Sequence, residues 1–214
     1  MKAFLLSQTI LLPIIIGLIR FRRLDRSYRP FFLLLLIGLV TELVGFILIN
    51  GYIKSNYVIV NVYVLLEWTL IAWQFHVWGF LQGRKNLFYG LLAFTTLCWV
   101  VENIVFGHII SIVPYFRFLY FFLIVLLSIN KINFMITHEM RNLFRNPKFL
   151  ICIGFIIYFI YMIVDFWAFE ISLLGDQSIV LRISFLMDYV NVISNIIYAI
   201  AFWMIPKPQK FTLG

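Results

Sequence analysis

Four polar side chains on the apolar segment 179–205 have the clearest capacity for chemistry in this chain. Their spacing of four, three and four positions puts them on one side of a helix, and they are Ser184, Asp188, Asn191 and Asn195. A carboxylate and amides that faced lipid would be costly. The pattern therefore predicts that this helix face borders a protein interior or a hydrated cavity.

Two more acids, Glu42 and Glu67, lie near the middle of other apolar segments. Together with Asp188 they have no basic residue at their own depth, so we expect the three carboxyls to share a proton or a cation. A hydrogen-bonded role in holding helices together is the alternative for each. The predicted ligand-binding or proton-binding residues are Glu42, Glu67, Asp188, Asn191, Asn195, Tyr63 and Tyr161.

Two other acids each have an arginine at a similar depth on the next helix. Asp165 is predicted to pair with Arg182, and Glu102 with Arg117. Because a charge in the membrane interior is costly, such pairs neutralise one another and fix the packing of a helical hairpin. We expect both to be structural ion pairs. Further tyrosines could line the cavity or serve only in packing, namely Tyr120 and Tyr158.

The composition identifies the class of protein. Of the 214 residues, 64% are hydrophobic and 12% are charged, whereas soluble domains carry about 25% charged residues. We therefore predict an all-α, polytopic membrane protein whose main partner is the lipid bilayer. The net charge of +8 does not indicate nucleic acid, because the basic residues are spread over short loops between apolar runs.

The apolar runs predict a single domain, 1–214, with seven transmembrane helices. The expected spans are 3–20, 31–50, 57–80, 88–106, 110–130, 149–168 and 179–205. The first is expected to be a retained helix rather than a cleaved signal peptide. The long connection 131–148 is expected on the inner surface, either as a short amphipathic helix or as a basic loop.

The distribution of basic residues predicts the orientation. Thirteen Lys and Arg residues follow the odd-numbered predicted helices on one side, against Lys2 and Lys54 on the other. The positive-inside rule then places the N-terminus outside and the C-terminus inside the cell inner (plasma) membrane. The five acids within the predicted helices would all lie at the midplane or in the outer half. We expect them to converge on one outward-facing acidic cavity.

Two pairs of segments suggest an internal duplication. The residues around Glu67 resemble those around Asp188, and the stretch that opens at Pro30 resembles the one that opens at Pro147. This similarity predicts a parallel 3+1+3 repeat, with helices 1–3 matching helices 5–7. In transporters with such repeats, binding sites lie at the interface between the repeats.

Several cofactors do not fit the sequence. A retinal Schiff base needs a lysine in the last helix, and 179–205 contains none. Haem and zinc need histidines that meet, whereas His76, His108 and His138 belong to different levels. We therefore expect no retinal, haem or metal site, and the cofactor, if any, stays unassigned.

One short stretch resembles a known family. Leu65-Leu66-Glu67-Trp68 resembles the Leu-Glu-Glu-Trp region of the small integral-membrane carotenoid (lycopene) cyclases. This chain has a single acid there, preceded by Val64, Leu65 and Leu66. The resemblance implies a shared architecture of about seven helices, and no catalytic residue is carried over from it.

The sequence therefore predicts a protein that binds a small polar or cationic ligand, as a carrier that could be coupled to protons, or as a sensor. An enzyme from another class also fits, in which Glu67 or Asp188 acts as a general acid on an isoprenoid or lipid. A third reading is a structural subunit that pairs with a membrane-protein partner or forms a homo-oligomer.

Overall fold

A computed structural model describes residues 6–51, 56–80, 85–111, 114–138, 142–172 and 177–206. Side chains are not described within this part for Arg23, Asn50, 169–172, 177–182 and Ser184. The regular structure of the described residues is helical. The main helices are α2 (Leu11–Ile19), α3 (Arg29–Gly51), α4 (Tyr57–Val77), α5 (Lys85–Val100), α6 (Pro114–His138), α7 (Pro147–Ser172) and α8 (Gln177–Met204).

Prolines and glycines set several of these boundaries. Pro114 and Pro147 occupy the first positions of α6 and α7, where the missing N–H would have no helical partner. Gly79 ends α4 with a φ of 100°, and the next residue, Phe80, donates its N–H back to the Phe75 carbonyl at 3.0 Å. This arrangement is the usual glycine-dependent stop of a helix.

The described residues include six helices that are long and apolar enough to cross a membrane. The prediction of an all-α, polytopic membrane protein is therefore confirmed. Of the first predicted span, 3–20, the described part is helical from Leu6 to Ile19, and residues 1–5 lie outside the described part. Within it, η1 (Gln8–Ile10) is a 3₁₀ turn that lies between the helical residues Leu6 and Ser7 and helix α2.

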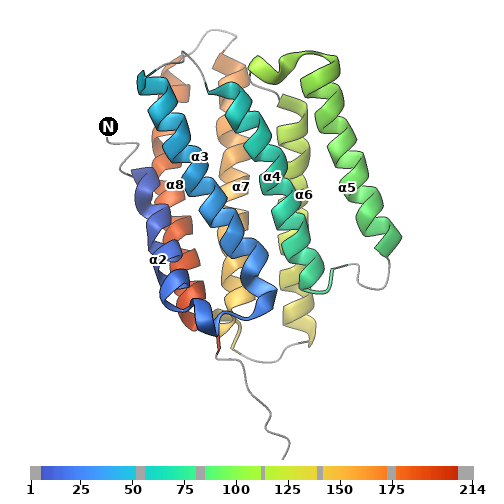
Figure 1. Ribbon diagram of the computed structural model, residues 1–214, viewed down its shortest axis with the longest axis vertical. Helices are drawn as coiled ribbons and strands as arrows, with labels where there is room; N and C mark the ends of the chain where they lie inside the picture. Colours follow the sequence, from blue (N-terminus) through green and yellow to red (C-terminus); the bar gives the residue numbers. More distant parts are fainter. Residues whose placement is uncertain are drawn as a thin grey trace, which may run out of the picture.

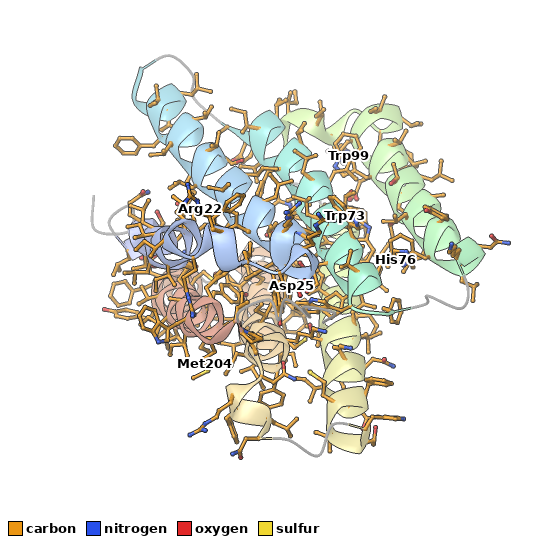
Figure 2. All side chains as sticks on the ribbon, turned by 60° about the horizontal axis from the view of Figure 1, so that its bottom comes forward. Arg22, Asp25, Trp73, His76, Trp99 and Met204 are labelled. Carbon is orange, nitrogen blue, oxygen red and sulfur yellow. The ribbon has the colours of Figure 1, made fainter. Side chains whose placement is uncertain are left out.

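Six helices form a ring, and α5 lies outside it. Around the ring, the packed pairs run α2–α8, α8–α7, α7–α6, α6–α4, α4–α3 and α3–α2. Helix α5 packs against the outside of α4 and α6, and Figure 1 shows it at the edge of the bundle. Figure 2 shows Trp99 between α4 and α5, where its Nε1 donates to the Asn61 carbonyl at 3.0 Å.

Aromatic side chains fill the interior at one end of the bundle. The Phe31 ring contacts Tyr198 and Phe202 at centroid distances of 5.0 and 5.5 Å, and it contacts Phe155 at 5.5 Å. Residues from α3, α7 and α8 are thus joined in one buried cluster. Phe155 and Phe159 of α7 extend that cluster toward the centre of the bundle.

The same end carries basic residues on its turns, and we call it the basic end, with the far end opposite. It lies at the bottom of Figure 1 and faces forward in Figure 2, where Arg22 and Asp25 are labelled. Arg20 donates to the Phe202 carbonyl at 3.1 Å, and Lys131 donates to the Trp78 carbonyl at 3.0 Å. Gln74 accepts from the Phe31 N–H and donates to the Ser27 carbonyl.

The connection 131–148, expected to be a separate amphipathic helix or loop, begins instead as a continuation of the preceding helix. Helix α6 continues to His138, so the first residues of the connection are the last two turns of that helix. Residues 139–141 lie outside the described part, and η6 (Leu143–Arg145) is a single 3₁₀ turn before α7.

Candidate functional site

A cavity of about 280 Å³ lies inside the ring of helices. Residues of α3, α4, α6, α7 and α8 line it, and Ile10 of η1 contributes at one side. The lining includes eight aromatic rings, from Phe31, Tyr63, Tyr120, Phe121, Phe155, Tyr158, Phe159 and Tyr198. Its polar members beside the tyrosines are Thr41, Glu42, Asn56, Glu67, Arg117, Asn191 and Asn195.

Glu67 is the buried acid at the centre of this site, with 8% of its surface exposed. Its Oε1 accepts from the Tyr63 hydroxyl at 3.1 Å, and its Oε2 accepts from the Tyr120 hydroxyl at 2.9 Å. Tyr63 lies four residues before Glu67, which places both on the same face of α4. Tyr120 reaches the carboxylate from α6. Each carboxylate oxygen therefore has one hydroxyl donor, and the residue lines the cavity.

Glu42 lies across the cavity on α3 and is half-buried. It is hydrogen-bonded to the Ser7 side chain, whereas its Oε2 is buried and has no hydrogen-bond partner among the described residues. A methyl group on Gly38 would lie 3.2 Å from the Tyr63 hydroxyl, and one on Gly45 would lie 3.0 Å from the Asn56 side-chain nitrogen. These two glycines therefore let α3 approach α4 closely on either side of the carboxylate.

The polar stripe of α8 reaches the cavity in part. Asn195 is 3% exposed and donates to the Asn191 side-chain oxygen and to the Thr9 hydroxyl, both at 3.0 Å. Both asparagines line the cavity. Asp188 is half-buried but is not among the lining residues, and the side chain of Ser184 lies outside the described part.

Tyr161, which was predicted to bind the ligand, is not among the residues that line the cavity. Its hydroxyl donates to the Ile183 carbonyl at 2.7 Å, so it joins α7 to α8 beside the cavity rather than within its lining. Of the seven predicted binding residues, the cavity thus brings together Glu42, Glu67, Tyr63, Asn191 and Asn195.

Arg117 is part of the cavity site, although the sequence analysis predicted only a structural ion pair for it. It lines the cavity, and it interacts electrostatically with Glu67. One terminal nitrogen donates to the Asn61 side-chain oxygen at 3.0 Å, while its Nε is buried and has no hydrogen-bond partner in the described part of the chain. Glu67 therefore shares the cavity with a basic residue, which the sequence analysis did not expect.

Glu102 interacts electrostatically with Arg117, but its described hydrogen bonds go to the backbone. Its two oxygens accept from the backbone N–H groups of Tyr115 and Phe116 at 2.8 and 2.6 Å. These are among the first N–H groups of α6, which have no partner within the helix. Glu102 therefore caps α6, and it lies 5% exposed in the π-helical turn η4 (Val101–Val105) that follows α5.

Asn61 ties Arg117 to the far end. Its side-chain nitrogen donates to the carbonyls of Ile109 and Ser111, both at 3.0 Å. With the contact from Arg117, every polar group of this amide is used. We call Asn61, Trp99, Glu102 and Arg117 the far-end network. The other expected ion pair involves the Arg182 side chain, which lies outside the described part, while Asp165 is half-buried on α7.

Tyr198 is a lining residue that the sequence analysis missed, although a signal for it exists. It lies three residues after Asn195 on α8 and thus continues the polar stripe by one turn. Its ring packs on Gly154 of α7, where a methyl group would collide with it. The phenylalanines that line the cavity from α7, Phe155 and Phe159, gave no such signal, because phenylalanine is frequent throughout this chain.

Known proteins give no further identification of this site. No family model, no curated protein and no solved structure matches the chain.

Proposed function

We propose that this protein binds a small monovalent organic cation in the central cavity, as a carrier that exchanges the cation for a proton, or as a sensor. The orientation that we propose has the far end outside and the basic end inside, as the basic residues of the loops favour. The observation that carries the proposal concerns Glu42, which lines this cavity and has a buried Oε2 without a hydrogen-bond partner among the described residues.

The charge of the lining supports a ligand with one positive charge. Two carboxylates, Glu42 and Glu67, border the same space as one guanidinium, that of Arg117. In a medium of low dielectric constant, an unbalanced carboxylate is strongly unfavourable. A monovalent cation would balance the second carboxylate when the site is filled, and a proton would balance it when the site is empty.

The aromatic lining supports an organic cation rather than a metal ion. Alkylammonium groups are bound well by the faces of aromatic rings, and tyrosines and phenylalanines surround both carboxylates. The volume of about 280 Å³ lies near the lower limit of ordinary small-molecule sites. It fits a compact head group such as a tetraalkylammonium.

Exchange for a proton follows from the same balance of charge. When a cation leaves, one carboxyl takes up a proton, and the next cation displaces it. Asn191 and Asn195 would extend a polar route along α8 toward the basic end. Asp188, one turn nearer the far end, would attract cations toward the site.

Binding of tetraethylammonium to the protein in lipid nanodiscs tests this proposal. Glu67→Gln should weaken binding about tenfold or more, because it removes the charge while keeping a side chain of the same shape. Affinity should also fall as the pH is lowered, because a protonated carboxyl no longer attracts the cation. Glu102→Gln is the matched control, since it changes a buried carboxyl outside the cavity. Equal affinity in Glu67→Gln and the unmodified protein would refute the proposal.

Liposomes distinguish the carrier from the sensor. A carrier should take up labelled tetraethylammonium when the internal pH is lower, and Asp188→Asn should reduce that uptake. Binding without uptake would favour a sensor.

One observation favours a different class. The floor of the cavity is apolar, with Phe31, Phe155 and Phe159, and Glu67 lies above it with two tyrosine donors. The same arrangement would suit an enzyme in which Glu67 protonates an isoprenoid or lipid. Accumulation of an unprocessed lipid in cells that carry Glu67→Gln, with normal cation binding by the purified protein, would favour the enzyme.

A further inference from the structure

Arg117 is the only cationic side chain among the described residues that line the cavity. It is the fourth residue of α6, so it lies at the end of the first turn of that helix, near the far end. The positive end of the helix dipole disfavours a cation at this place. The guanidinium therefore depends on neighbouring acids for its balance of charge.

The described direct contacts of this guanidinium are with neutral groups. A terminal nitrogen donates to the Asn61 side-chain oxygen at 3.0 Å. The central carbon lies 5.9 Å from the centroid of the Phe166 ring, which is within the range of a cation–π contact. Both contacts hold the group at the border of the cavity, but neither of them neutralises it.

Two carboxylates interact with Arg117 electrostatically, namely Glu67 and Glu102. Glu67 lines the cavity, whereas both oxygens of Glu102 accept backbone N–H groups of α6. The second carboxylate of the lining belongs to Glu42, whose described polar contact is with Ser7. Arg117 therefore balances Glu67 within the cavity, and the charge of Glu42 is left for the ligand.

We propose that Arg117 determines the charge of the ligand, because it occupies the place of a second positive charge in the site. The site would then accept a monocation and reject a dication of similar size. This inference rests on the proposed function and names the residue that sets its selectivity. Without the guanidinium, the two carboxylates should accept a dication such as an alkyl diammonium. Without Glu67 instead, Arg117 and Glu42 should balance each other, and no cation should bind well.

This selection depends on charge rather than on size. A cavity of about 280 Å³ is large enough for a short alkyl chain with a charge at each end. In a site of low dielectric constant, a fixed positive charge strongly repels a second one. Specificity of this kind comes from a repulsive element that is built into the site.

Two ligands of the same length isolate the effect of charge. In tetramethylenediammonium, an ammonium group replaces the terminal methyl group of n-pentylammonium. Binding of each to the protein in lipid nanodiscs is measured at a mildly alkaline pH, where protons compete less for the carboxyls. The unmodified protein should bind the monocation about tenfold or more tightly than the dication. Arg117→Gln should reverse this order, whereas Arg117→Lys keeps the charge and should retain it.

A double variant tests the same count of charges in a second way. Glu67→Gln alone should bind both ligands weakly. Adding Arg117→Gln should strengthen monocation binding about tenfold or more, because one carboxylate and no fixed cation then remain. Removal of both members of a buried pair is less destabilising than removal of one, so the double variant decides the question even if Arg117→Gln alone does not fold. Glu102→Gln is the matched control, since it removes the electrostatic partner outside the lining and should leave the monocation preferred.

The outcomes separate this inference from the proposed function. The inference is refuted if folded Arg117→Gln still prefers the monocation, if Arg117→Lys also reverses the order, or if the double variant binds no better than Glu67→Gln. The proposed function survives these results as long as the unmodified protein binds n-pentylammonium or tetraethylammonium. An unmodified protein that binds neither monocation would refute the proposed function, and this inference with it.

Discussion

The far-end network and the central cavity both contain a buried carboxylate, yet the two are satisfied differently. In the far-end network, Glu102 accepts two backbone N–H groups at the start of α6. In the cavity, Glu42 has one oxygen that is buried without a partner. Burial alone therefore does not mark a functional acid. An acceptor without a described partner, on a residue that lines a cavity, is the more specific sign, because buried polar groups are nearly always satisfied.

Arg117 belongs to both regions and makes the contrast sharper. One terminal nitrogen of Arg117 donates to the Asn61 side-chain oxygen at the far end. The same residue lines the cavity, and its Nε is buried without a described hydrogen-bond partner. A change at the far end should therefore reach the cavity mainly through Arg117. The following predictions test how separate the two regions are, from the largest expected effect to the smallest.

The largest effect is expected from Glu102→Ala. Two N–H groups at the start of α6 lose a charged acceptor, and the free energy of unfolding should fall by about 3 kcal/mol. Denaturant unfolding in detergent measures this change. Tetraethylammonium should bind the folded variant with unchanged affinity. A loss of affinity without a loss of stability would show that Glu102 belongs functionally to the cavity.

Asn61→Ala should have the next largest effect. The variant loses two contacts to the carbonyls before α6 and the contact from Arg117, which we expect to lower the free energy of unfolding by about 2 kcal/mol. Because Arg117 is then released, cation affinity should change as well. Asn61→Asp is the control, since it keeps an acceptor for Arg117 but cannot donate to the carbonyls. Affinity unchanged in Asn61→Ala would contradict the coupling.

Tyr120→Phe should have a smaller effect on stability. It removes one of the two hydroxyl donors to Glu67 without changing the packing of the ring, and we expect a loss of about 1 kcal/mol in thermal unfolding. Tyr158→Phe serves as a control, because that cavity tyrosine makes no described hydrogen bond to Glu67. Equal effects of the two changes would mean that the contact with Glu67 contributes nothing specific.

The smallest effect on stability is expected from Glu42→Gln. Since one oxygen has no partner, the free energy of unfolding should change by about 0.5 kcal/mol or less. Cation affinity should nevertheless fall about fivefold, because one of the two carboxylates is neutralised. Parallel unfolding and binding titrations check both values. A large loss of stability with normal binding would show that Glu42 stabilises the fold and does not bind the cation.

Much of the fold follows from the sequence because apolar length is a strong constraint in a membrane. Six predicted spans correspond to described helices of spanning length. The first, 3–20, is described only from residue 6, and it is helical from Leu6 to Ile19. The sequence does not identify its neighbours, which are α3 and α8.

The site could be predicted where spacing along one helix was sufficient. Tyr63 with Glu67, and Asn191 with Asn195, share helix faces at intervals of four, and all four residues line the cavity. Asp188 shares the general stripe but lies outside the lining, because helix tilt and rotation decide the last part of its direction. Glu102 and Arg117 were placed at similar depths, but depth does not identify partners that come from the bends between helices.

The contact between α2 and α8 has a consequence for how the protein is made. Arg20 and the Phe202 carbonyl are 182 positions apart in the chain, and α2 packs mainly against α8. The helix that leaves the ribosome early must therefore wait in the bilayer until almost everything else has been inserted. Until α8 has been inserted, the side of the polar interior that α2 later covers is open to the bilayer. Membrane-soluble molecules would then have access to it before synthesis is complete.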